Sequence, residues 1–244
     1  MSAGNSRYAW MKFIRVALVF SCFLTTPFPA RADEPYVTDD ASVLDRGACQ
    51  LELGKRTLRD SHQWYLLPAC NLFWDVEITL GRTGFSGPLG EGTLDTVIQA
   101  KGLWLAVEPN RFGFGWNIGT EVRRHPRRDE RRLHDITGTL IASRSFFDDR
   151  LIAHANGGVR WLRDEGRGAV TLGVLAEVNV TSRLALLAET YDTSRTRRFY
   201  QAGLRLAIVP EHVTLHVAAG GESNFSSTRQ WTIGLHLVSP PLFR

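Results

Sequence analysis

Lysine is scarce in this chain, which contains 3 lysines and 26 arginines among its 244 residues. An excess of positive charge is also missing from most of the chain. Four of the 29 basic residues and none of the 25 acidic ones lie in residues 1–32, so 25 of each sign remain in residues 33–244. The net charge of +4 thus comes from the N-terminus. It gives no reason to expect binding of nucleic acid.

Long hydrophobic runs are also missing. Only residues 13–28 approach the roughly 18 apolar residues of a membrane-spanning helix, which excludes a bundle of such helices. The content of 43% hydrophobic residues and only 10 prolines excludes a collagen-like or disordered chain. About 210 residues beyond the N-terminus are enough for one domain.

The N-terminus has the pattern of a secretory signal peptide. Lys12 and Arg15 precede an apolar stretch from Val16 to Thr26, and Ala30-Arg31-Ala32 provides the small residues of a cleavage site. We therefore expect residues 1–32 to be a signal peptide. A membrane anchor is the alternative, but the apolar run is short and no stop-transfer pattern follows it.

Two cysteines, Cys49 and Cys70, remain after the expected signal peptide. An exported protein meets an oxidising compartment, which permits a disulfide. A hairpin that turns at Arg59-Asp60 would place the two cysteines directly opposite each other, at a distance that suits an S–S bond. We expect this disulfide, and two free buried thiols are the alternative.

From Gly47 onward, apolar and polar residues alternate with the period of a β-strand. Phe112, Phe114 and Trp116 share one face of a segment, for example, and the glycines between them share the other. The pattern predicts twelve strands, at about 48–57, 62–71, 73–83, 94–107, 112–123, 134–147, 150–163, 168–180, 183–192, 198–209, 212–221 and 228–238.

Two all-β architectures fit this alternation, a soluble β-sandwich and a transmembrane β-barrel. The polar face is rich in glycine, threonine, asparagine and isolated charges, whereas a soluble surface would carry more lysine and glutamate. Ten strand residues rise about 33 Å, and a tilt of about 40° reduces this to the roughly 25 Å of a lipid-facing band. Both observations favour the barrel.

The predicted connections favour the barrel as well, because they alternate between long and short. Long or strongly polar gaps such as 84–93 follow the odd-numbered strands, and gaps as short as Leu72 follow the even-numbered ones. Aromatic residues cluster near both strand ends, as at two membrane interfaces. We expect residues 47–244 to form a twelve-stranded antiparallel β-barrel in the outer membrane of a Gram-negative bacterium.

Residues 33–46 lie between the signal peptide and the barrel. Their acidic side chains resemble those of a solvated periplasmic tail. A plug of the barrel, or a segment that binds a partner, is the alternative.

Short motifs follow one another between residues 36 and 107: Thr38-Asp39-Asp40, Gly47 to Glu52, Pro68, Asn71, Val76-Glu77, Gly81, Asp95, Gln99 and Lys101. In this order they resemble a proteobacterial family of outer-membrane transporters of the meta-cleavage phenol-degradation pathway. The resemblance implies transport of small hydrophobic or aromatic compounds. The cysteine pair and an arginine-rich loop depart from the family pattern.

With the apolar face outward, polar and charged side chains would line the lumen. Mixed charges can set selectivity in a narrow water path, which predicts passive passage of small solutes. They can also neutralise one another in a plugged or closely packed barrel, which would then serve envelope integrity without transport. The predicted lumen-lining residues are Glu52, Glu77, Asp95, Gln99, Lys101, Arg123, Arg160, Glu177, Glu189, Arg205, His216 and His236.

Arginine is concentrated in residues 123–132, on a predicted outer loop. Guanidinium groups bind phosphates in a two-pronged fork, so contact with lipopolysaccharide is one interpretation. A solvated loop in an arginine-rich protein is the other. The candidate contact residues are Arg124, Arg127, Arg128, Arg131 and Arg132.

Catalytic and metal-binding motifs are missing, including Gly-x-Ser-x-Gly and His-Glu-x-x-His. His154 and Asn156 share a face, and Ser143 and Ser145 lie on the preceding strand, but all four are predicted to face the lumen, away from any lipid substrate. His216 and His236 are diagonal neighbours without a third ligand. We expect no enzyme activity, no metal and no cofactor. A lipid-modifying enzyme remains the third alternative.

Overall fold

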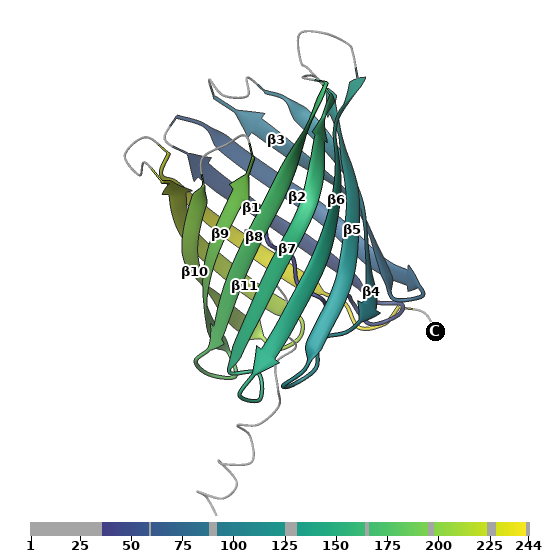
Figure 1. Cartoon of the computed structure of the whole chain (residues 1–244), viewed down its shortest axis with the longest axis vertical. Helices are drawn as coiled ribbons and strands as arrows, with labels where there is room; N and C mark the ends of the chain where they lie inside the picture. Colours follow the sequence, from purple (N-terminus) through teal and green to yellow (C-terminus); the bar gives the residue numbers. More distant parts are fainter. Residues whose placement is uncertain are drawn as a thin grey trace, which may run out of the picture.

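A computed structural model describes residues 36–58, 60–87, 92–124, 131–163, 166–194, 198–223 and 228–242, with only the backbone for 131–134. The predicted signal peptide, residues 1–32, lies outside these residues. Twelve antiparallel strands close into one barrel, in which each strand pairs with its sequence neighbours and β1 pairs with β12 (Figure 1). The strands are β1 (Cys49–Leu58), β2 (His62–Phe73), β3 (Val76–Ser86), β4 (Leu94–Leu105), β5 (Phe112–Arg124), β6 (Arg131–Phe146), β7 (Leu151–Leu162), β8 (Arg167–Asn179), β9 (Leu184–Thr193), β10 (Phe199–Val209), β11 (Val213–Glu222) and β12 (Gln230–Val238).

The predicted twelve-stranded barrel is confirmed, and the sandwich alternative is wrong. Alternate side chains point outward and inward, as the period of two requires. Outward residues such as Leu80 and Leu140 are 61% and 62% exposed, whereas inward Asp95 and Glu177 are each 0% exposed. Closure leaves no unpaired sheet edge, so every strand has two partners. Within the described residues, no helix is long and apolar enough to cross a membrane.

Strand boundaries lie within three residues of the predicted ones. The largest differences occur where the backbone makes a tight turn or a long hairpin. Trp74 and Asp75 adopt positive φ angles of 56° and 53° in a turn, so β3 begins at Val76 rather than at residue 73. Arg131 and Arg132 belong to β6, and their backbones pair with β5. Their predicted position in a loop is wrong, because this hairpin extends further than its neighbours.

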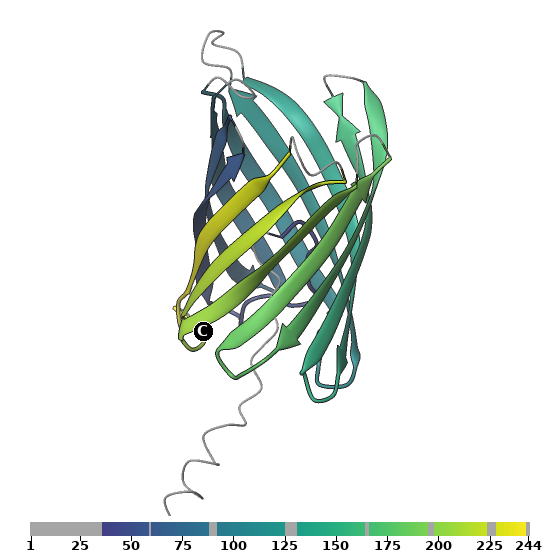
Figure 2. The ribbon, with the colours of Figure 1, turned by 90° about the vertical axis from the view of Figure 1, so that its left-hand side faces the viewer.

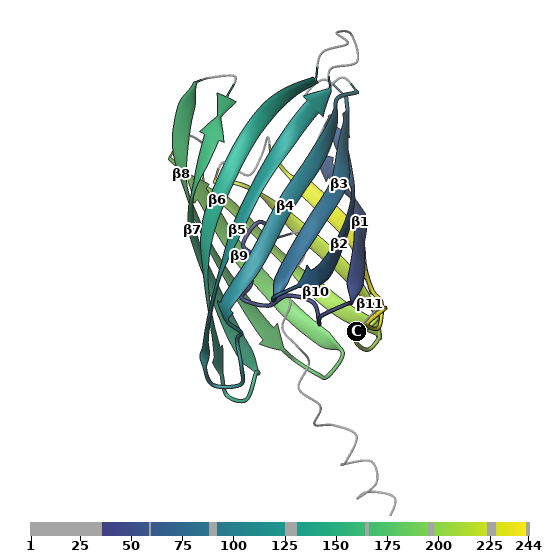
Figure 3. The ribbon, with the colours of Figure 1, turned by 90° about the vertical axis from the view of Figure 1, so that its right-hand side faces the viewer.

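The connections divide the barrel into two ends. Turns such as 74–75, 147–150 and 210–212 follow the even-numbered strands, and we call this the short-turn end. The connections that follow the odd-numbered strands lie at the opposite end, which we call the long-loop end. The long strands β5 and β6 reach this end (Figure 3). The predicted alternation of the connections therefore has a direct counterpart in the structure.

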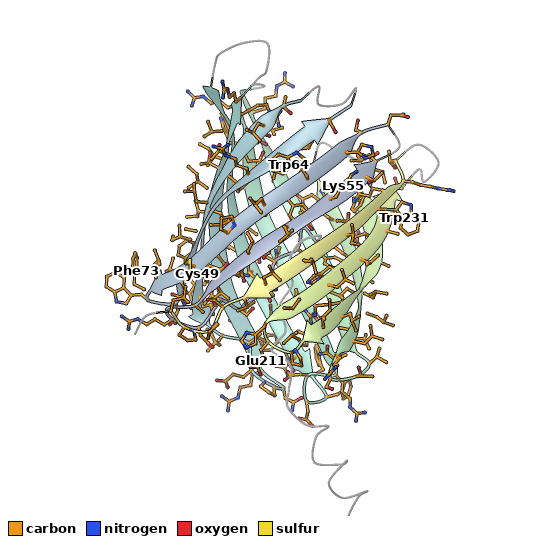
Figure 4. The ribbon with its side chains drawn as sticks, turned by 180° about the vertical axis from the view of Figure 1, so that it is seen from behind. Cys49, Lys55, Trp64, Phe73, Glu211 and Trp231 are labelled. Carbon is orange, nitrogen blue, oxygen red and sulfur yellow. A yellow bond between two sulfur atoms is a disulfide. The ribbon has the colours of Figure 1, made fainter. Side chains whose placement is uncertain are left out.

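The disulfide links the first two strands at the short-turn end. Cys49 and Cys70 are paired residues of β1 and β2, with a Cα–Cα distance of 4.0 Å, and their sulfur atoms are bonded. The predicted bridge is therefore confirmed, and the alternative of two free thiols is wrong. Figure 4 labels Cys49 beside Phe73, at the left-hand edge of the barrel.

Residues 36–46, here called the lumen segment, run inside the barrel before β1 begins (Figure 2). Thr38 and Asp40 are each 1% exposed, Ala41 is 0% exposed and Leu44 is 2% exposed. Tyr36 packs in an apolar cluster with inward residues of β8, β9 and β11. The interpretation of residues 33–46 as a solvated tail is wrong for this part, which lies in the position that the plug alternative requires.

Candidate functional site in the barrel lumen

One end of the lumen segment is held by a carboxylate on β9. Glu189 accepts hydrogen bonds from the backbone N–H groups of Val37, at 2.9 Å, and of Thr38. Its other oxygen accepts a hydrogen bond from the side-chain amide of Gln201 on β10. Glu189 is 4% exposed, so these donors replace the water that a buried carboxylate loses. This wall of the barrel therefore fixes the direction in which the segment leaves Tyr36.

The middle of the lumen segment is clamped by a lysine on β4. The Lys101 ammonium lies 2.6 Å from a carboxylate oxygen of Asp39 and 2.7 Å from one of Asp40. Asn117 on β5 donates a hydrogen bond of 2.8 Å to the second oxygen of Asp39. The Lys101 side chain is 10% exposed and that of Asp40 is 1% exposed. Buried charges need such partners, because a lone charge in this position would be strongly destabilising.

The end of the segment nearest β1 is held by further hydrogen bonds to the wall. The Ala41 N–H donates to the Ser143 hydroxyl at 2.8 Å, and the Leu44 N–H donates to the Glu77 carboxylate at 3.3 Å. The Asn71 amide donates to the Leu44 carbonyl at 2.7 Å. These contacts come from β2, β3 and β6, so the segment touches the wall over much of its circumference.

Two inward glycines leave room for the segment. An added Cβ at Gly173 on β8 would lie 2.4 Å from the Thr38 hydroxyl oxygen, and its nearest neighbours would all be Thr38 atoms. An added Cβ at Gly203 on β10 would lie 2.6 Å from the Tyr36 hydroxyl. A larger residue at Gly173 would therefore collide with the lumen segment.

Cavities lie on both sides of the lumen segment. No described residue lines a cavity on one side and also a cavity on the other. Two cavities of about 210 and 240 Å³ are lined in part by residues 36–39, and the larger also reaches Lys101. A third, of about 480 Å³, is lined by Ser42, Val43, Asp45 and Ala48 and by the short-turn end, including His212. The segment is thus the constriction of the lumen, with space above and below it.

Ion pairs line the wall beyond the constriction. Toward the long-loop end, Arg123 makes a two-pronged contact with Asp95, with nitrogen–oxygen distances of 2.7 and 3.0 Å. Arg160 pairs with Asp135 on the neighbouring strand. Arg205 pairs with Glu177 below the Tyr36 cluster, where both side chains are almost fully buried. Charges of both signs therefore line the path, and most are satisfied by a neighbour.

The structure places all twelve predicted lumen residues on the inner face. Glu52 and Gln99 line the cavity beside the segment, and His236 lines the one beneath it. His216 lies directly opposite Gly234, which makes His216 and His236 diagonal neighbours as expected. Residues 36–46 are part of the site, although their sequence favours a solvated tail over a plug of the barrel. The signals in the sequence that this segment lies inside the barrel are its apolar residues and the inward glycines of the strands.

The structure describes only some of the candidate outer-loop arginines. Arg124 ends β5 and is exposed at the long-loop end. Arg127 and Arg128 lie outside the described residues. Arg131 and Arg132 are described only by their backbone, which belongs to β6.

The serine and histidine considered for catalysis are hydrogen-bonded to each other. The Ser143 hydroxyl lies 2.8 Å from Nδ1 of His154, and each residue is 1% exposed. Ala41 of the lumen segment donates to the same hydroxyl. The pair therefore anchors the segment, and the segment covers it. Among the described residues, no group of three histidine, cysteine or acidic side chains is arranged to hold a metal ion.

Tyr36 carries the perturbed hydroxyl of the lumen segment. Burial raises the pKa of Tyr36 above its ordinary value, and the nearby Glu189 carboxylate raises it further. A tyrosine is in any case neutral at pH 7, so Tyr36 packs in its cluster as a neutral, mainly apolar anchor.

Solved structures with a similar fold are outer-membrane barrels. A KdgM porin in complex with disordered oligogalacturonate matches with a TM-score of 0.59 and 11% identity, over 77% of this chain and 98% of that one. The COG4313 outer membrane channel from Pseudomonas putida F1 matches with a TM-score of 0.55 and 11% identity, over 85% and 100%. The NanC porin matches with 0.55 and 9%, over 78% and 98%. At these identities, the likeness concerns the fold alone.

Sequence comparison assigns the chain to a family. No curated protein sequence matches it significantly. The family described as "Uncharacterised conserved protein UCP029691" matches residues 20–238, which include the whole barrel, and the chain therefore belongs to this family.

Proposed function

We propose that the protein is an outer-membrane channel for small polar solutes, with the lumen segment as its adjustable constriction. The observation that carries the proposal is the position of residues 36–46 between the cavities, held by polar contacts to the wall. Ion pairs and hydrogen bonds of this kind can be exchanged for contacts with water. The apolar cost of displacing the segment is confined to the cluster around Tyr36 and to the buried side chains of Ala41 and Leu44.

The outer surface supports a location in a bilayer. Aliphatic side chains such as Val174 and Ile233 are 51% and 54% exposed on the middle of the wall, and tryptophans lie nearer its ends. The predicted signal peptide is the expected export route to the outer membrane. In this orientation the long-loop end faces the cell exterior and the short-turn end faces the periplasm.

The lining residues favour solutes that form hydrogen bonds. The cavity toward the long-loop end is lined by Thr120, Thr137, Thr139, Asn117 and Gln99. The resemblance to phenol-degradation transporters implies small hydrophobic or aromatic solutes. A phenol satisfies both indications, because its hydroxyl can bond to this lining, whereas a hydrocarbon would leave these polar groups without partners.

Planar-bilayer recording of the purified, refolded protein tests the channel. Asp39→Asn with Asp40→Asn removes the charges that Lys101 holds, and we expect a larger or more frequently open conductance than in the wild type. Asp60→Asn, on an exposed turn outside the lumen, is the matched control and should leave conductance unchanged. Liposome swelling with small sugars, and uptake of 4-hydroxybenzoate, would then define the solutes.

A structural barrel without transport is the second candidate. The burial of the Arg205–Glu177 pair and of the Lys101 cluster favours it, because these contacts also hold the lumen closed. If neither the wild type nor the Asp39→Asn/Asp40→Asn variant conducts, the channel proposal is wrong and the closed barrel is supported.

A further inference from the structure

The wall that faces away from the lumen carries very few charges. Leaving aside the two terminal residues at each strand end, the described outward positions are charged only at Lys55 on β1, Arg82 on β3 and Arg144 on β6. A charge on the lipid-facing side of a barrel is costly near the middle of the bilayer and cheap only near its interfaces. Each of these three cations therefore needs a physical explanation.

Arg144 has its explanation within the wall. Its guanidinium lies 4.2 Å from the ring centre of Phe112 and 5.3 Å from that of Phe146, toward the short-turn end. Stacking of this kind stabilises a cation at the edge of a bilayer. Lys55 and Arg82 have no such aromatic cation contact among the described residues, and they lie toward the other end.

Lys55, Trp64 and Arg82 form one patch across three strands, here called the basic patch. Lys55 lies directly opposite Trp64, and Arg82 lies opposite Leu66, two residues along β2. The Trp64 indole reaches over the neighbouring strand, since an added Cβ at Gly84 would lie 2.3 Å from its ring. Gly84 and Arg82 point to the same side of β3, so the indole lies on the same face of the wall as Arg82, and Trp64 belongs to the strand between those of the two cations.

The basic patch lies near the long-loop end of the wall. Trp64 and Trp231 are 45% and 64% exposed there, and Figure 4 labels both beside Lys55, far from Phe73 and Cys49 at the other end. Exposed tryptophans mark the level at which a bilayer changes from hydrocarbon to headgroups. The long side chains of Lys55 and Arg82 can reach that level from the strands.

On this part of the wall, no described acidic side chain pairs with these cations. Away from the strand ends, the described outward positions of β12 and of β1 to β4 hold aliphatic, aromatic, small or hydroxyl residues and no aspartate or glutamate. Among the described residues, neither Lys55 nor Arg82 forms an ion pair, so the basic patch is open to an anion on the membrane side. The partner that fits is an anion fixed at headgroup level, beside a ring on which a tryptophan can pack.

We propose that the basic patch binds a phosphate group of lipid A, the membrane anchor of lipopolysaccharide. This inference rests on the outer-membrane location proposed above. Arg82 offers two parallel N–H groups to the phosphate oxygens, and Lys55 adds a compact positive charge on the other side of Trp64. The indole covers the sugar that carries the phosphate. The site is separate from the lumen and from the arginines of the outer loop.

The test is a titration of the folded protein in detergent with bisphosphorylated lipid A, followed by native mass spectrometry. We expect Lys55→Gln with Arg82→Gln to weaken binding by about 10- to 30-fold, because each cation near the surface adds affinity for an anionic lipid. Arg144→Gln, the outward cation at the other end, is the matched control and should change binding less than about twofold. Lys55→Arg, which keeps both charges and the Arg82 guanidinium, should retain most of the affinity.

Dephosphorylated lipid A provides the second arm. It should bind the wild type as weakly as bisphosphorylated lipid A binds the double glutamine variant. Wild-type affinity in that variant, or equal binding of the two lipids by the wild type, would overturn the proposal. Heat-modifiable migration of each variant on a gel confirms that the barrel is folded. Conductance is recorded in bilayers without lipopolysaccharide, so failure of the channel proposal is seen independently.

Discussion

Lys101 and Asp40 form an ion pair of 2.7 Å inside the barrel, between β4 and a segment 61 residues earlier in the chain. A second carboxylate, that of Asp39, shares the same ammonium group. This cluster joins the wall to the segment that narrows the lumen. It is therefore the place where stability and permeability are linked.

Removal of the lysine alone should be more harmful than removal of the whole cluster. Lys101→Met leaves two carboxylates in a buried site, and we expect a loss of about 3–5 kcal/mol in the free energy of unfolding. Lys101→Met combined with Asp39→Asn and Asp40→Asn should recover part of that loss. Urea titration followed by gel migration measures both. A triple variant less stable than the single one would contradict the interpretation.

Gly173→Val should displace the lumen segment while the barrel stays closed. Its new side chain meets Thr38 and no wall atom among its nearest neighbours. Hydrogen–deuterium exchange should then become faster at the amides of Val37, Thr38 and Ala41, which donate to Glu189 and Ser143 in the wild type. Gly138→Ala, where an added Cβ meets nothing within 4 Å, is the control. Unchanged exchange in the valine variant would argue against a fixed position of the segment.

The disulfide should stabilise the barrel chiefly by restricting the unfolded chain. Cys49 and Cys70 are 21 residues apart, and closing such a loop contributes about 3 kcal/mol in the chain-entropy model. Cys49→Ser with Cys70→Ser should lower the free energy of unfolding by about that amount. A reducing agent should produce the same loss in the wild type and none in the variant. Alkylation of both thiols in the unreduced protein would disprove the bridge.

The arginines of residues 127–132 should strengthen the membrane surface if they bind lipopolysaccharide. Replacement of Arg127, Arg128, Arg131 and Arg132 by alanine should make cells more sensitive to detergent and to chelators, because bridging contacts to phosphate are lost. Growth inhibition assays measure this. Equal sensitivity of variant and wild-type cells, at equal protein levels, would favour a solvated loop.

Much of the barrel could be predicted from the sequence because its determinants are local. Alternation along each strand specifies which side chains face lipid, and the hairpin turns specify the register. The opposition of Cys49 and Cys70 follows from one turn, and that of His216 and Gly234 from another. The sequence predicts a loop at Arg131–Arg132, because charged residues near a hairpin tip carry no alternation.

The lumen segment could not be predicted in the same way, because its partners are distant. Thr38 contacts Glu189, 151 residues later, and Asp39 contacts Lys101, 62 residues later. A short segment without periodicity carries no sign of which wall it will meet. Its aspartates looked like solvated residues, since nothing in the neighbouring sequence offers them a cation.

The lumen segment also has a mechanical consequence. Glu189 belongs to β9 and Lys101 to β4, and these strands lie five positions apart in a ring of twelve, almost across the barrel from each other. Residues 37–40 therefore link two facing parts of the wall through hydrogen bonds and ion pairs. These contacts oppose a change in the distance between the two walls, so displacement of the segment should make the cross-section of the barrel easier to deform.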